Sequence, residues 1–309
     1  VLFRSEGHDV SIQALSHHKK GERGGSALFE AAQAVPGVQA LDLYARYPDY
    51  AIDVEALRSA LPARVAIIED AAHAIGSSYA DGQKVGSCTS SQMTIFSFHP
   101  SKTMTTGEGG MVTTNDEEYA RRLRLFRNNG LERDAQYLKG QPAPWYYEVK
   151  EISNNTHMTE IQAALGLSQL SRLDTFVEKR RHLWKRYQEK LKNIPHLMLF
   201  ETEAVEQTAF HLMVVQIDYT AYGTTRTAVM DKLKEQEIGT QVHYIPLYRH
   251  PFLAEGRREI NGYFPKMEAY YEQALSLPLF YDMTEEDVDR VVDTLQSILA
   301  KTSAPTNTA

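Results

Sequence analysis

Two residues that could act together in catalysis lie in one segment of the sequence. Asp70 ends the apolar run VAIIED (65–70), and Lys102 follows a second apolar run, MTIFSF (93–98), ahead of the glycine-rich turn GEGG (107–110). A lysine and an acid at one sheet edge are typical of a pyridoxal phosphate site, because the lysine can form a Schiff base with the cofactor and the acid can keep its ring nitrogen protonated. Taken alone, the pair is weak evidence, since carboxylates are common at strand ends and most lysines are solvated.

Three short apolar segments would have to position these residues. VAIIED has the β-branched composition of a buried parallel strand, and such strands carry functional groups at their carboxyl ends. MTIFSF (93–98) and GMVTTN (110–115) are bounded by glycine or polar turns and predict two further strands. DEEYARRLRLFR (116–127) begins with acids and ends with bases, an order that complements a helix dipole and predicts a helix.

The remaining sequence predicts further helices and strands. Residues 26–43 indicate a helix, a turn and a short strand, and residues 54–61 indicate another helix. The longest helical pattern runs from Thr159 to about Leu191 and would be about 45 Å long, so we place a domain junction along it. A strand is expected at 210–218, helices at about 224–236 and 284–300, and a disordered tail at 301–309.

The composition excludes several classes of protein. A chain of 309 residues predicts two domains, or one large α/β domain with an appendage, and no apolar run is long enough to span a bilayer. The net charge of −7 has the wrong sign for binding nucleic acid by bulk charge, so any polyanionic ligand would need a local site. Cys88 is the single cysteine and no Cys/His cluster has zinc-ligand spacing, so we expect no metal site, no internal disulfide and a reducing, cytoplasmic location.

Three motifs give the Asp70–Lys102 segment much higher specificity. EDAAHAIG, FSFHPSK and TTGEGGMVTTN resemble the cofactor-binding core of the DegT/StrS-type sugar-nucleotide aminotransferases, a branch of the fold-type I pyridoxal phosphate enzymes. The resemblance continues through NNTHMTEIQAALGLSQL, VHYIPLY and ALSLPLF and covers about residues 56–300. It implies an α/β fold with a large mixed-sheet domain and a small C-terminal α/β domain. Within the family, PWYYEV, FRNNG and VHYIPLYRHPF are most similar to the transaminase of pseudaminic acid biosynthesis, which makes UDP-4-amino-4,6-dideoxy-N-acetyl-β-L-altrosamine.

The resemblance implies a role for each matching residue. Lys102 would be the Schiff-base lysine and the base that moves the substrate proton, and Asp70 would pair with the ring nitrogen. His73 would sit beside the ring and its 3-hydroxyl, although simple packing is an equal alternative. Ser97 would bond the cofactor phosphate. Asn155 would reach the phosphate of the neighbouring subunit's cofactor, which implies a homodimer with shared active sites.

The substrate also follows from the resemblance alone. His243 and Tyr244 occupy the stretch expected to approach the sugar nucleotide across the subunit interface. The implied reaction moves an amino group from glutamate to C4 of a UDP-linked 4-keto-6-deoxy-N-acetylhexosamine. A dehydratase of the same family would carry histidine at the lysine position, so Lys102 argues against that alternative.

The N-terminal part departs from the family pattern. We find no Ser-Gly-Thr helix start to cradle the phosphate, no ring-stacking aromatic residue and no His-rich strand before EDAAH. Residues 15–55 instead resemble a flavodoxin-like NAD(P)H:quinone oxidoreductase, although a divergent aminotransferase N-terminus is an alternative. We therefore expect a foreign or divergent segment (1–55), a truncated large domain (56–175), a small domain (176–300) and a tail (301–309). We expect such a truncated chain to bind the cofactor weakly or not at all, so a catalytically dead relative is one alternative function. A flavin-dependent oxidoreductase is the other, favoured only by residues 15–55.

Overall fold

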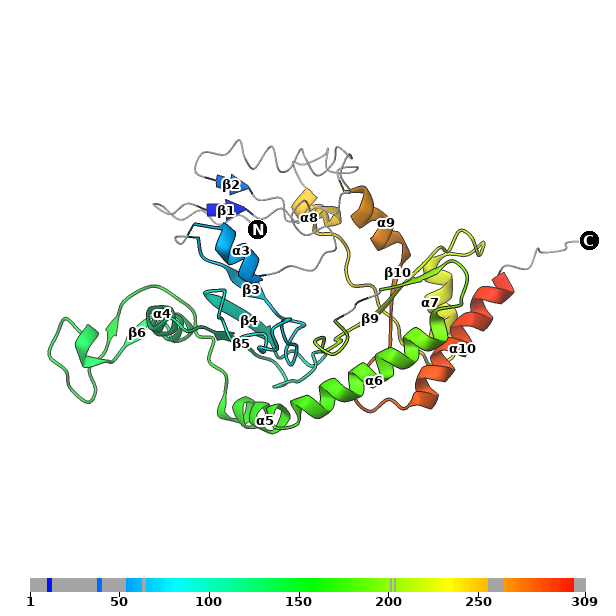
Figure 1. Ribbon diagram of the computed structural model, residues 1–309. Coiled ribbons are helices and arrows are strands. Elements are labelled where there is room, and N and C mark those ends of the chain that lie inside the picture. Colours follow the sequence, from blue (N-terminus) through cyan, green and yellow to red (C-terminus); the bar gives the residue numbers. More distant parts are fainter. Residues whose placement is uncertain are drawn as a thin grey trace, which may run out of the picture. The chain divides into compact units, whose positions relative to one another are not determined.

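The computed structural model describes residues 10–12, 38–40, 54–62, 65–200, 202, 204–254 and 264–302 (Figure 1). The chain divides into two compact units. The Lys102 unit contains residues 66–181 and 204–211, and the His243 unit contains residues 1–65, 182–203 and 212–309. Within the described residues, no helix combines the length and the apolar character needed to cross a membrane.

A three-stranded mixed sheet forms the base of the Lys102 unit. Its order is β3 (Ile68–Asp70), β4 (Met93–Ser97) and β5 (Gly110–Thr113), in which β3 pairs parallel to β4 and β4 pairs antiparallel to β5. These strands lie within the three predicted segments. One expectation is wrong in part, because Ile68 is 54% exposed and VAIIED is therefore not buried on both faces.

The two faces of this sheet have different environments. Side chains alternate along β4, so Thr94 and Phe96 are buried while Ile95 between them is exposed. Phe96 belongs to a buried cluster with Ala71, Phe98 and Met104. Burial of these apolar side chains fixes the register of the sheet, since a one-residue slip would expose them.

A helix and a small hairpin follow β5. Helix α4 (Glu117–Arg127) begins at Asp116, whose side chain accepts a hydrogen bond from the Tyr119 backbone N–H. The short strands β6 (Leu131–Glu132) and β7 (Glu148–Val149) pair antiparallel, with the 3₁₀ turn η1 (Ala135–Tyr137) between them. Gly130 enters this hairpin with φ +68°, and a Cβ atom there would lie 1.9 Å from the Glu151 carbonyl oxygen, so only glycine fits.

The single long helix predicted over Thr159–Leu191 is in fact two helices. They are α5 (Glu160–Leu170), which opens with a capping box between Thr159 and Gln162, and α6 (Leu173–Leu191). At the break the Ser171 hydroxyl donates to the Ser168 carbonyl at 2.9 Å. A serine that bonds its own preceding turn competes with the helical ladder, which gives a physical reason for the interruption.

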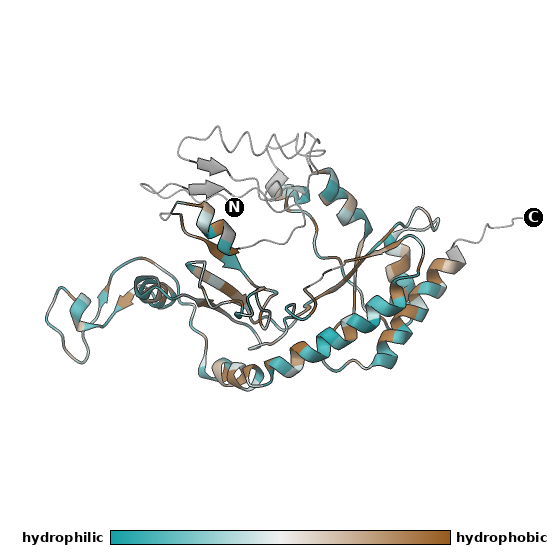
Figure 2. Cartoon of the chain, viewed as in Figure 1, coloured by the Kyte–Doolittle hydropathy of each residue, from teal (hydrophilic) through white to brown (hydrophobic). Residues whose placement is uncertain are grey.

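The His243 unit contains a second, antiparallel sheet of order β10 (Ala274–Leu277), β9 (Met213–Ile217) and β8 (Leu197–Leu199). All four side chains of β10 are buried, as are Met213, Val215 and Ile217 of β9. The helices are α3 (Val54–Ala60), α7 (Arg226–Glu235), α8 (Pro251–Ala254), α9 (Pro265–Gln273) and α10 (Glu285–Thr302), with η2 (Leu247–Arg249) between β9 and β10. Polar and apolar residues form separate stripes along α6 and α10 (Figure 2).

The N-terminal predictions fall mainly outside the described residues. Two strands, β1 (Val10–Ile12) and β2 (Val38–Ala40), pair in parallel there. The helix expected near residues 26–35, most of the segment with a flavodoxin-like resemblance and most of the 301–309 tail lie outside the described part of the chain.

Candidate active site

Strand register places two predicted site residues on the exposed face of the Lys102 unit's sheet. Asp70 pairs with Ile95, and Ile95 pairs with Val112 on the next strand, so these three lie in one row. Ser97 is two residues beyond Ile95 and therefore points to the same face. Asp70 and Ser97 are thus diagonal neighbours about 8 Å apart on a surface that also carries the exposed apolar side chains of Ile95 and Val112.

The opposite face holds β3 in position through a half-buried carboxylate. Glu69 accepts hydrogen bonds from the hydroxyls of Tyr79 (2.5 Å), Thr94 (3.2 Å) and Ser91. Thr94 and Ser91 are themselves buried. Burial and the Glu69 contact raise the pKa of Tyr79, so its phenol remains a donor. Because Glu69 and Asp70 are consecutive in a strand, fixing one toward the core directs the other to the exposed face.

Lys102 lies half-buried in the loop after β4. Its backbone N–H donates to the His99 carbonyl at 2.9 Å, and the His99 ring Nδ1 lies 2.8 Å from the Ser101 hydroxyl. Burial lowers the pKa of Lys102 below its usual range, and the charge of Asp70 opposes this shift. The charge of the Asp70 carboxylate thus acts on the Lys102 amine.

The glycine-rich turn 107–110 is joined to the Lys102 loop by hydrogen bonds. The Phe98 backbone N–H donates to the Gly109 carbonyl at 2.8 Å, and the Thr106 hydroxyl donates to the Glu108 carbonyl at 2.7 Å. A Cβ atom at Gly109 would lie 2.3 Å from the Thr106 hydroxyl oxygen, so the close approach requires glycine. The Gln162 side chain of α5 also donates to the Glu108 carbonyl at 3.0 Å and ties the turn to that helix.

His73 lies just beyond Asp70 and packs on a histidine that the sequence gave no reason to select. The rings of His73 and His211 are 4.3 Å apart at 49°, with His73 exposed and His211 buried. Arg180 donates to the His211 carbonyl at 3.2 Å, and the Ser77 hydroxyl accepts from the Ala209 N–H at 3.0 Å. Segment 204–211 thus supports the site from 138 positions away in the chain, a distance at which no local pattern could have indicated it.

Asn155 lies in the same unit but on a different element. It is exposed in the segment before α5, and its backbone forms a bridge with that of Asn128. The Asn128 side-chain oxygen lies 2.8 Å from His157 Nε2, which fixes the segment to the end of α4.

His243 and Tyr244 lie in the other unit. The His243 ring is half-buried with Nδ1 2.7 Å from the Ser276 hydroxyl, and the Tyr244 ring, 60% exposed, meets it edge-on at 4.6 Å. An imidazole and a phenol presented together in this way could contact a polar ligand through hydrogen bonds and ring stacking.

The residues of the exposed sheet face suit a group that combines an aldehyde, a basic ring nitrogen and an anionic arm. A lysine with a lowered pKa is more often unprotonated and hence nucleophilic. Asp70 can hold a proton on a ring nitrogen, and the Ser97 hydroxyl can donate to an anion. The apolar side chains of Ile95 and Val112 provide a surface for a flat ring. The donor set therefore fits pyridoxal phosphate.

Comparison with known proteins gives a family match over most of the chain. The profile of the DegT/DnrJ/EryC1/StrS aminotransferase family matches residues 50–296. The uncharacterized protein MJ1066 of Methanocaldococcus jannaschii is 39% identical over 235 residues, which are 76% of this chain and 60% of that protein. This chain spans about 60% of the length of the curated relatives it matches.

Two solved structures have the same fold. PseC of Helicobacter pylori, described as an aminotransferase in the biosynthesis of pseudoaminic acid, matches with a TM-score of 0.69 and 28% identity over 82% of this chain and 66% of that one. The PLP form of Spr1654 from Streptococcus pneumoniae, a putative sugar aminotransferase, matches with a TM-score of 0.67 and 26% identity over 88% and 71%. These matches confirm the predicted mixed α/β fold, while the flavodoxin-like interpretation of residues 15–55 receives no support from the comparisons.

Proposed function

Because the chain belongs to the DegT/DnrJ/EryC1/StrS aminotransferase family, we propose that it uses pyridoxal phosphate to transfer an amino group to a nucleotide-linked keto sugar. One observation carries this proposal most strongly: the half-buried amine of Lys102, its pKa lowered by burial, interacts with the carboxylate of Asp70 on an exposed sheet face. The PLP form of the structurally similar Spr1654 supports the choice of cofactor.

The proposed substrate is a UDP-linked 4-keto-6-deoxy-N-acetylhexosamine, with glutamate as the amino donor. The pathway named for PseC supports this choice, together with the similarity of PWYYEV, FRNNG and VHYIPLYRHPF to the pseudaminic acid transaminase. His243 and Tyr244 would contact the sugar nucleotide. Neither residue is needed to hold the cofactor, so replacing them should change substrate affinity more than cofactor affinity.

Each residue of the exposed sheet face would have a separate task. When bound, pyridoxal phosphate would supply an electron sink for the charge that develops on the substrate carbon. Asp70 would hold the proton on the ring nitrogen, and the Ser97 hydroxyl would donate to the phosphate. Lys102 would carry the proton to and from the substrate carbon, a task suited to an amine whose pKa burial has lowered. His73, backed by His211, would lie beside the ring.

The working unit would be a dimer of this chain. Helix α5 is apolar on nearly all sides, yet Ile161, Leu167 and Leu170 are 84%, 70% and 51% exposed. A helix with this composition is normally covered, so the exposure of these apolar side chains supports a contact site on α5. Asn155 lies just before α5, so a second copy packed on this helix would bring Asn155 toward the partner's cofactor.

Amino transfer tests the proposal directly. The full chain would be incubated with pyridoxal phosphate, glutamate and the UDP-linked 4-keto sugar, and the amino sugar would be measured by mass spectrometry. Lys102→Ala should abolish its formation, whereas Lys84→Ala, a change at an exposed lysine of the same unit that pairs with Asp174, should not. Equal product from wild type and Lys102→Ala would refute the assignment, and no product from either would favour a catalytically inactive relative.

A further inference from the structure

An arginine-lined cavity of about 310 Å³ lies in the Lys102 unit between the end of α4 and the β6–β7 hairpin. None of its lining residues belongs to the exposed face that carries Asp70 and Ser97. The charged side chains that line it are Arg121, Arg124, Arg127, Arg133, Glu132 and Asp134. Four arginines and two acidic residues thus line one cavity, on a chain whose overall charge is −7.

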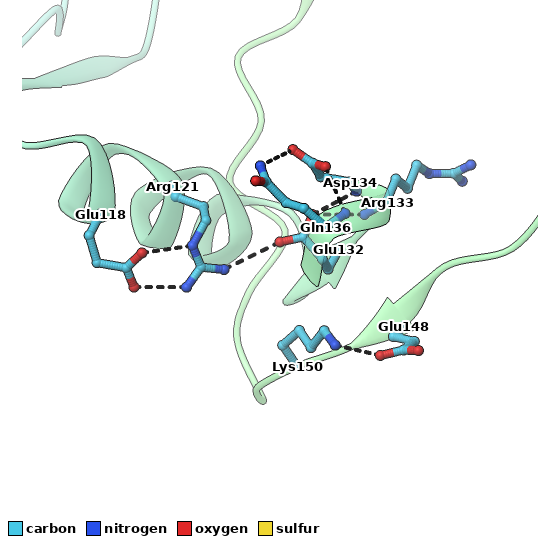
Figure 3. A network of polar contacts seen from close by, with 8 residues as sticks. All are labelled: Glu118, Arg121, Glu132, Arg133, Asp134, Gln136, Glu148 and Lys150. Carbon is cyan, nitrogen blue, oxygen red and sulfur yellow. Dashed lines mark hydrogen bonds and ion pairs between the residues drawn. The ribbon is translucent and has the colours of Figure 1, made fainter. Parts of the chain in front are cut away.

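A buried carboxylate builds the wall of this cavity. Glu132 is 6% exposed and accepts hydrogen bonds from the backbone N–H groups of Arg133 and Asp134, both at 2.9 Å. Arg121 reaches the same carboxylate at 3.3 Å and binds Glu118 through two hydrogen bonds of 2.8 Å (Figure 3). Arg121 therefore bridges Glu118 and Glu132, and its charge is already committed to these two carboxylates.

The other three arginines that line the cavity are exposed. Among the residues that the structure describes, Arg124, Arg127 and Arg133 form no ion pair. Arg133 instead lies over the Tyr147 ring at 5.1 Å. The helix dipole favours cations in the last turn of α4, which accounts for Arg124 and Arg127 there, but it does not account for Arg133, which comes from the hairpin and lines the same cavity.

We propose that this cavity binds the phosphate groups of a phosphate-bearing ligand. Guanidinium groups bind phosphate oxygens through paired, charge-assisted hydrogen bonds, and the cavity volume is at the lower end of the range for small-molecule sites. Because the chain is acidic overall, it needs a locally basic site to bind a polyanion, and this arginine-lined cavity can provide one.

The surroundings of the cavity indicate two sources of such a ligand. His157, which lines it, is two residues from Asn155, and its Nε2 atom lies 2.8 Å from Asn128. The nucleotide diphosphate of the sugar substrate is one source, and the cofactor phosphate of a second copy is the other. The identity of the phosphate-bearing ligand rests on the proposed function, whereas the binding of phosphate groups by the arginines does not.

Calorimetric titration of the full chain at low salt would test the proposal with three probes: inorganic pyrophosphate, UDP and pyridoxal phosphate. Removing the two unpaired helix charges in Arg124→Gln/Arg127→Gln should weaken pyrophosphate binding roughly ten- to hundredfold, the value of one or two charge-assisted hydrogen bonds. Arg122→Gln is the matched control, because Arg122 lies on the same helix, does not line this cavity and should leave affinity unchanged. Arg124→Lys/Arg127→Lys should retain an intermediate affinity.

The three probes separate the possible outcomes. Tighter binding of UDP than of pyrophosphate, lost in the double glutamine variant, would identify the nucleotide as the source, and the same pattern for pyridoxal phosphate would identify the cofactor. Failure of wild type to bind pyrophosphate and UDP, or equal affinity in the double variant, would overturn the proposal. Lys102→Ala should still bind pyrophosphate. A wild type that binds pyrophosphate, but whose Lys102 is not labelled by pyridoxal phosphate and borohydride, would refute the proposed function and leave this site intact.

Discussion

Glu69 provides the sharpest prediction about how the fold positions the site. Its carboxylate is the common acceptor for three hydroxyls on the buried side of β3, and Asp70 follows it on the exposed side. Glu69→Ala would leave the buried hydroxyls of Ser91 and Thr94 without this acceptor. Each such loss costs about 1–3 kcal/mol, while Tyr79 is only half-buried and can turn to water. We expect β3 to lose about 3 kcal/mol of local stability.

Amide hydrogen exchange measures this loss where it occurs. A change of about 3 kcal/mol corresponds to somewhat more than hundredfold faster exchange in peptides covering β3 and β4. Glu69→Gln keeps an acceptor oxygen and should lose only about 1 kcal/mol. Glu178→Ala, at an exposed glutamate of α6, is the control and should leave these peptides unchanged. Exchange in Glu69→Ala within about threefold of wild type would show that the network does not hold the strand.

Three further changes test other parts of the account. The pKa of Glu148 is lowered to about 2, mainly by its hydrogen bond with Lys150, so Lys150→Met should raise that pKa toward the ordinary value in a ¹³C NMR titration. The ionised carboxylate contributes its full stability above the unfolded pKa and loses it as the pH falls through the folded pKa. The wild-type hairpin should therefore loosen as the pH falls from about 4 toward 2. Leu167→Glu places a charge on the exposed apolar surface of α5 and should convert a dimer into monomers in sedimentation experiments, whereas an unchanged mass would exclude α5 from the interface. His211→Ala removes the ring behind His73 and should weaken pyridoxal phosphate binding about three- to tenfold, the value of one aromatic contact, while His211→Phe should not; equal affinity in all three proteins would leave His211 without a positioning role.

The sequence was most informative where local pattern and site coincide. The β-branched run VAIIED and the turns that bound MTIFSF predicted two strands, and both form. The same segments placed Asp70 at one strand end and Lys102 beyond the next, and the charge of Asp70 acts on the Lys102 amine against the lowering of its pKa by burial. The exposure of Ile68 was not predictable, since a β-branched run has the same composition whether one face or both are covered.

Long-range contacts account for most of what the sequence did not predict. His211 meets His73 only because segment 204–211 returns to the Lys102 unit, and nothing in TAFHLMV indicates this return. The break between α5 and α6 depends on one hydroxyl, that of Ser171, in an otherwise continuous helical pattern. The arginine-lined cavity is formed by side chains from α4 and the β6–β7 hairpin, and in the sequence the basic end of α4 indicated only a helix terminus.

The central claim is that the amine of Lys102, beside Asp70, is the group that reacts with the cofactor. Incubation of the full chain with pyridoxal phosphate, reduction with borohydride and peptide mapping would test it directly, because reduction makes even weak binding permanent. The account predicts the phosphopyridoxyl label on Lys102 and a strong reduction of that label in Asp70→Asn. An unlabelled Lys102, or label spread evenly over exposed lysines such as Lys84, would contradict it.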